Sequence, residues 1–214
     1  MKLLIFDLDG TLINTLQDLA NCCNHALQLH GFPTHETFAY KYFVGNGIDM
    51  LVERALPETH RQTAIIESVK TDFIAYYEQH AQDHTKPYTG IPELLIMLKE
   101  KGYLLSVASN KYHEATVPLV QHYFPTVGFD LILGHRSGRA AKPDPDIVLD
   151  TLNTLSVGPD DCFYVGDSSV DMITAVRAGV KAIGVTWGFR TEEELRENGA
   201  NYIVHEPSQL LKII

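Results

Sequence analysis

The sequence predicts an α/β protein with a doubly wound parallel sheet, a Rossmann-like core, and an inserted all-helical cap domain. Short, continuously apolar runs occur at residues 3–8, 104–108, 131–133, 163–165 and 182–185. Such runs are typical of strands that are buried on both faces of a parallel sheet. Helical patterns separate the later runs, as a parallel sheet requires. Between the first run and the second, helical patterns extend over about 70 residues without a convincing strand, which predicts the insertion.

The predicted cap follows the carboxyl end of the first strand directly. One amphipathic face consists of Leu16, Leu19, Cys23, Ala26 and Leu27 and ends before Gly31-Phe32-Pro33. A second long helix carries Ile66, Val69, Phe73, Tyr76 and Tyr77 at helical spacing. We therefore predict a core of residues 1–14 and 84–214 and a cap of residues 15–83. Parallel sheets bind ligands at the carboxyl ends of their strands, so the cap is expected to act as a lid.

The remaining helices of the core have ordinary start and stop signals. Leu94, Leu95 and Leu98 recur at helical spacing before Gly102, and a helix with Ile147, Val148, Leu149 and Leu152 follows Pro143 and Pro145. A helical run from Asp171 to Ala178 stops at Gly179, which suits a helix C-terminus. Thr191 and Glu194 have the spacing of a capping box.

Composition limits the class of protein. The chain has 214 residues, a hydrophobic fraction of 45% and a formal net charge of −10, so it is neither disordered nor a nucleic-acid binder. No apolar run approaches the roughly 18 residues of a membrane span, and no signal-peptide core is present. Three cysteines without regular spacing favour a reducing compartment. We expect a cytoplasmic protein that contacts neither nucleic acid nor membrane; the sequence indicates nothing about its oligomeric state.

An acidic pair follows the first predicted strand. Asp7 and Asp9 are two residues apart and precede Gly10-Thr11. Residues at this spacing share a face of a strand, so both carboxylates can point into one crevice. Two neighbouring carboxylates repel each other and need a cation or a shared proton. A simple turn would explain this motif equally well if it stood alone.

Three further strand ends carry polar side chains. Ser109-Asn110 follows the second apolar run, Lys142 precedes Pro143, and Asp167 and Asp171 follow the run at 163–165. Helix capping or solvation can explain each of them separately. Because all these strand ends meet at one edge of a parallel sheet, their combination instead indicates a single site.

These residue types suit phosphoryl transfer. Carboxylate oxygens are preferred ligands of Mg²⁺, which also binds substrate phosphate oxygens. A lysine and a hydroxyl can stabilise the oxygens of the moving phosphoryl group, and a second acid can protonate the leaving group. Four carboxylates against one lysine and one divalent cation leave a net negative charge. We therefore expect one of these carboxyls to carry a proton when a phosphate ester binds, with Asp9 as the leading candidate.

The same residues resemble the four ordered motifs of the haloacid dehalogenase superfamily. The motifs are Asp7-Leu8-Asp9-Gly10-Thr11-Leu12, Ser109-Asn110, Lys142-Pro143 and Gly166-Asp167-Ser168-Ser169-Val170-Asp171. The resemblance spans nearly the whole chain, and the helical insertion is similar to the α-helical cap of that superfamily. Within the cap, the segment from Val44 to Leu56 resembles that of bacterial phosphoglycolate phosphatases.

The resemblance implies specific roles. Asp7 is expected to be the nucleophile that forms an aspartyl-phosphate, and Asp9 the general acid and then the base. Ser109 and Lys142 are expected to hold the phosphoryl group. The resemblance places Mg²⁺ on Asp7, the backbone carbonyl of Asp9, Asp167 and Asp171, the last directly or through water. Thr11, Asn110 and, in the cap, Gly45 are expected to contact substrate.

The implied activity is Mg²⁺-dependent hydrolysis of a small phosphorylated metabolite, with 2-phosphoglycolate as the leading substrate. The dehalogenating members of the superfamily lack an acid at the position of Asp9, so ester hydrolysis is favoured over cleavage of a carbon–halogen bond. A sugar phosphate, a nucleotide or pyrophosphate would also be compatible with the motifs. So would a phosphosugar mutase of the β-phosphoglucomutase kind and, less readily, a non-enzymatic phospho-acceptor switch.

Overall fold

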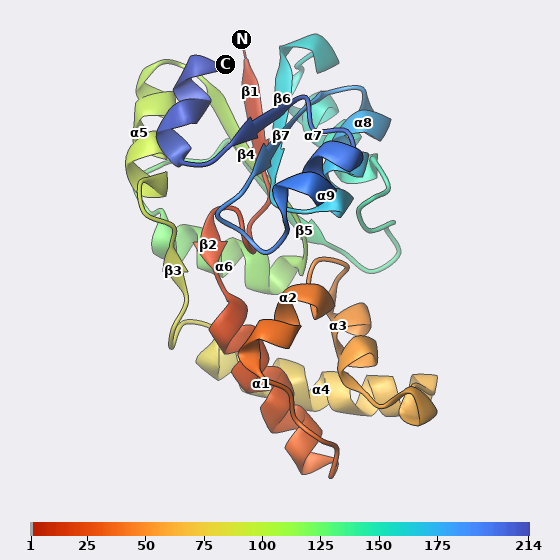
Figure 1. The fold of residues 1–214 in the computed structure, drawn as a ribbon. Coiled ribbons are helices and arrows are strands. Elements are labelled where there is room, and N and C mark those ends of the chain that lie inside the picture. Colours follow the sequence, from red (N-terminus) through yellow and green to blue (C-terminus); the bar gives the residue numbers. More distant parts are fainter. Residues whose placement is uncertain (1) are drawn as a thin grey trace. The chain divides into compact units, whose positions relative to one another are not determined.

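The computed structural model describes residues 2–214, which form two compact units (Figure 1). The core unit comprises the residues up to Ile13 together with Pro87–Ile214, and the cap unit comprises Asn14–Lys86. Two short strands, β2 (Ile13–Asn14) and β3 (Lys86–Pro87), pair where the chain passes between the units.

A six-stranded sheet forms the centre of the core unit, and every pairing in it is parallel. Its strand order is β5-β4-β1-β6-β7-β8. The strands are β1 (Leu3–Phe6), β4 (Leu104–Tyr112), β5 (Leu131–His135), β6 (Cys162–Gly166), β7 (Lys181–Val185) and β8 (Tyr202–Val204). The predicted parallel α/β fold with a helical insertion is confirmed.

Helices cover both faces of this sheet. The core helices are α5 (Ile91–Glu100), α6 (His113–Tyr123), α7 (Asp146–Leu155), α8 (Ser169–Ala178) and α9 (Glu192–Glu197). Short 3₁₀ helices span Pro159–Asp161 and Pro207–Lys212. Figure 1 shows α5 and the C-terminal 3₁₀ helix on one side of the sheet and α7 and α8 on the other. Leu3 and Ile5 of β1 pack in one buried cluster with Val148, Met172 and Leu195, which come from α7, α8 and α9.

The strand ends differ from the prediction in two places. Strand β4 continues beyond Ala108 to Tyr112, so Ser109 and Asn110 lie within the strand rather than after it. Its pairing with β5 is irregular there: Ser109 pairs with Gly134, and the next pair is Tyr112 with His135, so β4 advances three residues while β5 advances one. The edge strand β8 was not predicted, since three residues are too short to stand out as an apolar run.

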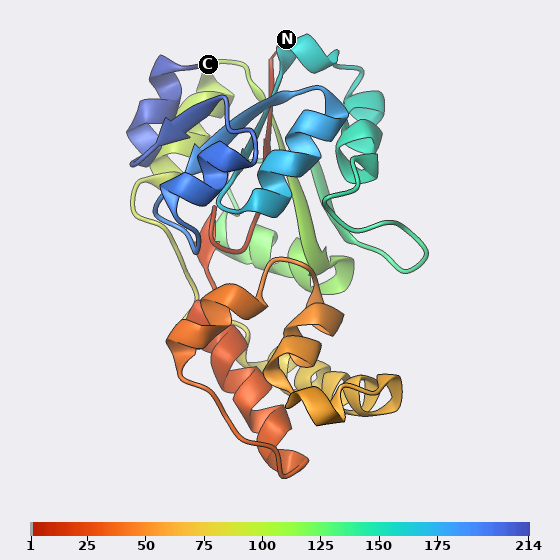
Figure 2. The ribbon, with the colours of Figure 1, turned by 45° about the vertical axis from the view of Figure 1, so that its right-hand side comes forward.

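Four helices build the cap unit: α1 (Leu16–Leu29), α2 (Tyr40–Phe43), α3 (Ile48–Ala55) and α4 (Thr63–His80). Figure 2 shows them in orange to yellow. Two 3₁₀ helices, Thr37–Ala39 and Glu58–His60, lie between them. Most residues of the predicted apolar faces are buried: Leu19, Cys23, Ala26 and Leu27 on α1, and Val69, Phe73 and Tyr77 on α4. The remaining three, Leu16, Ile66 and Tyr76, are half-buried. Among residues 2–214, no helix combines the length and apolar character needed to cross a bilayer.

A buried carboxylate joins the two ends of the cap unit. Asp18, in the first turn of α1, is 1% exposed. Its Oδ2 accepts hydrogen bonds from the backbone N–H of Thr85 at 2.8 Å and the Thr85 hydroxyl at 2.7 Å. The N–H of His84 lies 3.0 Å from both Asp18 oxygens. The start and the end of the cap segment are therefore held together by one side chain.

Replacing Asp18 with Ala should lower the free energy of unfolding by roughly 2–4 kcal/mol, because two N–H groups and a hydroxyl lose their acceptor. Urea unfolding followed by far-UV circular dichroism measures this difference. Asp18→Asn retains one acceptor oxygen at nearly the same volume and should lose less. A loss of under about 0.5 kcal/mol in Asp18→Ala, the range of an ordinary surface substitution, would contradict the role given to this carboxylate.

Candidate active site

Asp7 lies at the carboxyl end of the central strand β1, and Lys142 approaches it. The Nζ of Lys142 is 3.0 Å from Oδ1 of Asp7, and both residues are buried. Burial raises the pKa of Asp7 to about 6; the charge of Lys142 opposes this rise, and the carboxylates of Asp171 and Asp9 add to it. A buried ion pair is costly to desolvate, so its presence at a strand end makes Asp7 a candidate functional group.

Lys142 is held by several oxygens. Its ammonium donates to the carbonyl of Ala108 at 3.0 Å, to Oη of Tyr164 at 2.8 Å and to Oδ1 of Asp171 at 2.8 Å. Burial opposes its charge, but Asp171 and Asp7 outweigh that effect and hold the pKa of Lys142 well above its usual value. The lysine is therefore a fixed positive charge. Tyr164, which the sequence presents only as an apolar strand residue, belongs to this network.

Asp167 and Asp171 follow strand β6 and complete an acidic cluster. Asp167 accepts from the hydroxyl of Thr11 at 3.0 Å and from the backbone N–H of Phe189 at 2.8 Å. Burial raises the pKa of Asp167 to about 8, with further contributions from Asp171 and Asp7. Oδ2 of Asp171 accepts from the N–H of Ser168 at 3.1 Å and its hydroxyl at 2.7 Å, which caps helix α8.

Glycines allow the acids to approach the backbone closely. A Cβ at Gly188 would lie 2.4 Å from the Cβ of Asp167, and a Cβ at Gly166 would lie 2.3 Å from the Cβ of Asp171. At Gly10, where φ is +90°, a Cβ would meet Oδ2 of Asp167 at 2.4 Å. Only glycine fits at these three positions, so the carboxylates of Asp167 and Asp171 are placed by the surrounding chain.

The cluster fits a divalent cation. One carboxylate oxygen from each of Asp7, Asp167 and Asp171 lies within 4.8 Å of the other two. Burial and mutual repulsion raise the pKa values of Asp7 and Asp167, and a cation would relieve both effects. Buried carboxylate oxygens are hard donors of the kind that Mg²⁺ binds. Each oxygen of Asp171 already accepts two hydrogen bonds, whereas each oxygen of Asp167 accepts one, so Asp167 has more lone pairs left for a cation.

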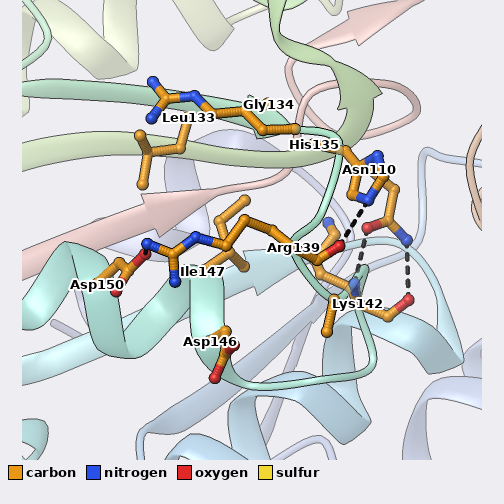
Figure 3. A pocket seen from close by; sticks show the side chains of 11 residues that line it. Asn110, Leu133, Gly134, His135, Arg139, Lys142, Asp146, Ile147 and Asp150 are labelled. Carbon is orange, nitrogen blue, oxygen red and sulfur yellow. Dashed lines mark hydrogen bonds and ion pairs between the residues drawn. The ribbon is translucent and has the colours of Figure 1, made fainter.

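Three predicted residues of the core unit have protein partners. Asn110 Nδ2 donates to the carbonyl of Lys142 at 2.9 Å, and the N–H of Lys142 donates to Asn110 Oδ1 at 2.8 Å (Figure 3). Asn110 thereby anchors the backbone of Lys142. The Thr11 hydroxyl donates to Oδ1 of Asp167, and the Ser109 hydroxyl accepts from the N–H of Lys111 at 3.3 Å. Contacts of these three side chains with substrate stay predictions.

The pocket drawn in Figure 3 has a volume of about 50 Å³. It is lined by Asn110, Leu133, Gly134, His135, Arg136, Arg139, Ala140, Lys142, Asp146, Ile147 and Asp150. Asp7, Asp9 and Asp167 do not line it, so it is not the acid-lined site.

Two residues of the site were missed or undervalued by the sequence reasoning. Lys111 Nζ lies 2.9 Å from Oδ2 of Asp9, and its side chain is only 4% exposed. Lys111 is therefore a second buried lysine beside the four carboxylates, so the local charge is less negative than the sequence suggested. Trp187, which the sequence did not mark as a site residue, donates from its indole Nε1 to the carbonyl of Thr11 at 3.0 Å.

Gly45 lies in the cap unit, on the loop between α2 and α3, with φ of +112°. Arg54 holds this loop by donating to the carbonyl of Phe43 at 3.0 Å and to Oδ1 of Asn46 at 2.9 Å. The loop therefore has a defined conformation within the cap. A contact between Gly45 and substrate stays a prediction.

Comparison with known proteins identifies the family of this chain. The family model of the haloacid dehalogenase-like hydrolases matches residues 4–185. Phosphoglycolate phosphatase from Haemophilus influenzae (strain Rd) is 32% identical over 219 residues, covering 100% of this chain and 98% of the relative. The phosphoglycolate phosphatase of Aquifex aeolicus is likewise 32% identical, with coverages of 100% and 97%.

A crystal structure from Lactobacillus delbrueckii subsp. bulgaricus has a TM-score of 0.93 to this chain, with 34% identity and coverages of 100% and 99%. The acidic cluster, the parallel sheet with its helical insertion, and these likenesses over the full length agree with one another. The chain belongs to the haloacid dehalogenase-like hydrolases and, within them, to the phosphatases.

Proposed function

We propose that this protein is a Mg²⁺-dependent phosphatase that hydrolyses 2-phosphoglycolate through an aspartyl-phosphate on Asp7. The observation that carries the proposal is the buried Asp7 carboxylate, 3.0 Å from the Lys142 ammonium and clustered with Asp167 and Asp171. The position of this carboxylate at the carboxyl end of the central strand, where parallel sheets bind ligands, supports its role as the attacking group.

In the first step, a carboxylate oxygen of Asp7 forms a bond to phosphorus as the bond from phosphorus to the ester oxygen breaks. Asp9 gives its proton to that ester oxygen, so the alcohol leaves neutral. The Ser109 hydroxyl donates to an equatorial oxygen, and the positive charge of Lys142 offsets the negative charge that grows on the phosphoryl group and Asp7 in the transition state. Because Lys142 is fixed by Ala108, Tyr164 and Asp171, little reorganisation is needed during the reaction.

In the second step, Asp9, now a carboxylate, takes a proton from water as the water oxygen attacks phosphorus. The bond between phosphorus and Asp7 breaks, inorganic phosphate leaves, and Asp9 is again protonated for the next turnover. Asp7, Asp167 and the backbone carbonyl of Asp9 are the groups proposed to hold Mg²⁺, with Asp171 orienting Lys142 and the metal shell. The cation supplies positive charge next to the transferred phosphoryl group.

The choice of 2-phosphoglycolate rests on the two phosphoglycolate phosphatases that match the chain over its full length. It is tested by measuring phosphate release from a panel of esters with and without Mg²⁺. The panel includes 2-phosphoglycolate, hexose phosphates, nucleoside monophosphates and pyrophosphate. We expect the highest kcat/KM with 2-phosphoglycolate. A higher value with another ester would contradict the substrate, and a bisphosphate-dependent isomerisation of hexose phosphates would contradict hydrolysis as the main reaction.

Removal of divalent cations with EDTA should abolish turnover, and Mg²⁺ should restore it. Mg²⁺ should also raise the melting temperature, more at pH 8 than at pH 5. Without a cation, the raised pKa values of Asp7 and Asp167 mean that stability falls as pH rises from about 4 towards 8. A cation binds the deprotonated carboxylates and offsets that loss, by about 2.7 kcal/mol at 100 times its Kd. Thermal unfolding at both pH values measures the effect; a larger shift at pH 5 would contradict this assignment of the ligands.

A further inference from the structure

Lys111 is a buried lysine in the core unit for which the mechanism above has no use. Its side chain is 4% exposed, and its Nζ lies 2.9 Å from Oδ2 of Asp9. Burying an ammonium group is costly unless a carboxylate compensates its charge. A lysine at this depth is therefore not a solvated surface charge.

The backbone around Lys111 is fixed at several points. Its N–H donates to the hydroxyl of Ser109 at 3.3 Å, and its carbonyl accepts from the hydroxyl of Thr116 at 3.1 Å. At Gly134 on strand β5, a Cβ would lie 2.6 Å from that carbonyl, so only glycine fits against it. Lys111 also lies in the irregular part of the pairing between β4 and β5. Such irregularities near active sites redirect a side chain, here towards Asp9.

The two oxygens of Asp9 have different surroundings. Oδ2 is bonded to Lys111, whereas Oδ1 is buried and has no hydrogen-bond partner among residues 2–214. A buried acceptor without a partner is rare in a structural role and is expected where a group must bind or react. The carboxylate is thus held by one oxygen, with the other left for a partner that the protein itself does not supply.

We propose that Lys111 is a positioning residue that holds Asp9 by Oδ2, so that Oδ1 moves the proton to the leaving oxygen and later from water. This inference rests on the proposed function, because it needs Asp9 to act as the acid and base. Without the lysine, the carboxylate can rotate, and proton transfer is sensitive to displacements of about 1 Å.

The test compares Lys111→Met with the unchanged protein on two esters of different leaving group. When the bond from phosphorus to the ester oxygen of 2-phosphoglycolate breaks, glycolate leaves as a strongly basic alkoxide unless its oxygen is protonated. The leaving group of p-nitrophenyl phosphate, p-nitrophenolate, is weakly basic and needs no proton. The ratio kcat/KM reports the first chemical step, in which that proton is used. We expect kcat/KM to fall roughly 10- to 100-fold with 2-phosphoglycolate and by less than about threefold with p-nitrophenyl phosphate. The value of kcat should fall with both, since both share the second step.

Two further variants frame this result. Asp9→Asn should show the same dependence on leaving group to a larger extent, because it removes the acid itself. Lys99→Met removes another paired lysine, which lies 2.8 Å from Asp130 and far from Asp9 in the sequence, and should change neither value. If circular dichroism shows that Lys111→Met does not fold, Lys111→Gln, which keeps a polar N–H end, is measured in the same way.

The outcomes separate the possible roles of Lys111. An equal loss of kcat/KM with both esters would mean that Lys111 binds the phosphoryl group or only supports the fold, and no loss with either would mean that Asp9 does not need it; both overturn the proposal. If the unchanged protein hydrolyses neither ester, the proposed function itself fails. If it hydrolyses both and the ratio between them is unaltered in the variant, only the role of Lys111 fails.

Discussion

Replacement of Asp7 by Asn is expected to lower kcat on 2-phosphoglycolate by on the order of 10⁴-fold or more, because an amide nitrogen does not replace the attacking carboxylate oxygen. Phosphate release under saturating substrate and Mg²⁺ measures the loss. Asn has nearly the same size as Asp, and burial already disfavours the charge at this position, so the variant should fold.

The control for this variant is Asp160→Asn, an identical change at an exposed residue of the 3₁₀ helix Pro159–Asp161. It should retain full activity. Wild-type turnover in Asp7→Asn, in a preparation free of contaminating phosphatase, would rule out Asp7 as the nucleophile.

The second large effect is expected in Asp9→Asn, with turnover of 2-phosphoglycolate reduced by about 10²- to 10⁴-fold, the usual contribution of general acid–base catalysis. Here the chemistry predicts more than a slower rate. With p-nitrophenyl phosphate the first step needs no proton, whereas the second still lacks its base. The aspartyl-phosphate should therefore accumulate, visible as a burst of p-nitrophenol close to one equivalent per enzyme.

A slow linear release of p-nitrophenol without a burst would place the action of Asp9 in the first step alone. Retention of full activity on 2-phosphoglycolate would remove Asp9 from the mechanism. Asp160→Asn again serves as the matched control, since its carboxylate lies outside the site.

The fold was predictable from the sequence because a parallel sheet buried on both faces leaves a simple pattern. Strands β1, β4, β6 and β7 are nearly continuous apolar runs, and the absence of such runs between Thr15 and Asp83 marked the insertion. The acids could be placed as well, since Asp7 and Asp167 directly follow strands whose carboxyl ends share one edge of the sheet.

Other parts of the site depend on three-dimensional detail that residue types do not carry. Lys111 is one of 17 basic residues, and only the extension of β4 and its irregular pairing direct it to Asp9. Tyr164 lies between Phe163 and Val165 in a buried strand and looks like a core residue in the sequence. Its part in the site is visible only in the structure, where Lys142 donates to its hydroxyl. For Lys111, the only signal in the sequence is its position directly after Ser109 and Asn110 near the end of a buried strand.

The hydrogen-bond partners of Thr11 and Asn110 illustrate the same limit. Both were expected to contact substrate because their motifs resemble those of the superfamily. In the structure Thr11 bonds to Asp167, and Asn110 bonds to the backbone of Lys142 in both directions. A sequence identifies a polar side chain at the edge of a site, but it does not tell whether that group faces the ligand or holds a neighbour that does.

The acidic character of the chain, a net charge of −10, is reconciled with an anionic substrate within the site itself. Lys142 contacts Asp7 and Asp171, and Lys111 contacts Asp9, so two of the 17 basic residues are buried among the acids. The divalent cation proposed for the acidic cluster would complete the compensation. Local charge balance, rather than the charge of the whole chain, governs the approach of a phosphate ester.

The most direct test of the account is to identify the residue that carries the phosphoryl group during turnover. Asp9→Asn is mixed with p-nitrophenyl phosphate and Mg²⁺, quenched in acid and reduced with borohydride, which converts an aspartyl-phosphate to homoserine. Peptide mass spectrometry then locates the change. We predict homoserine at position 7, in an amount that matches the burst of p-nitrophenol. Modification at another acid such as Asp167, or a burst without any modified residue, would contradict covalent catalysis by Asp7.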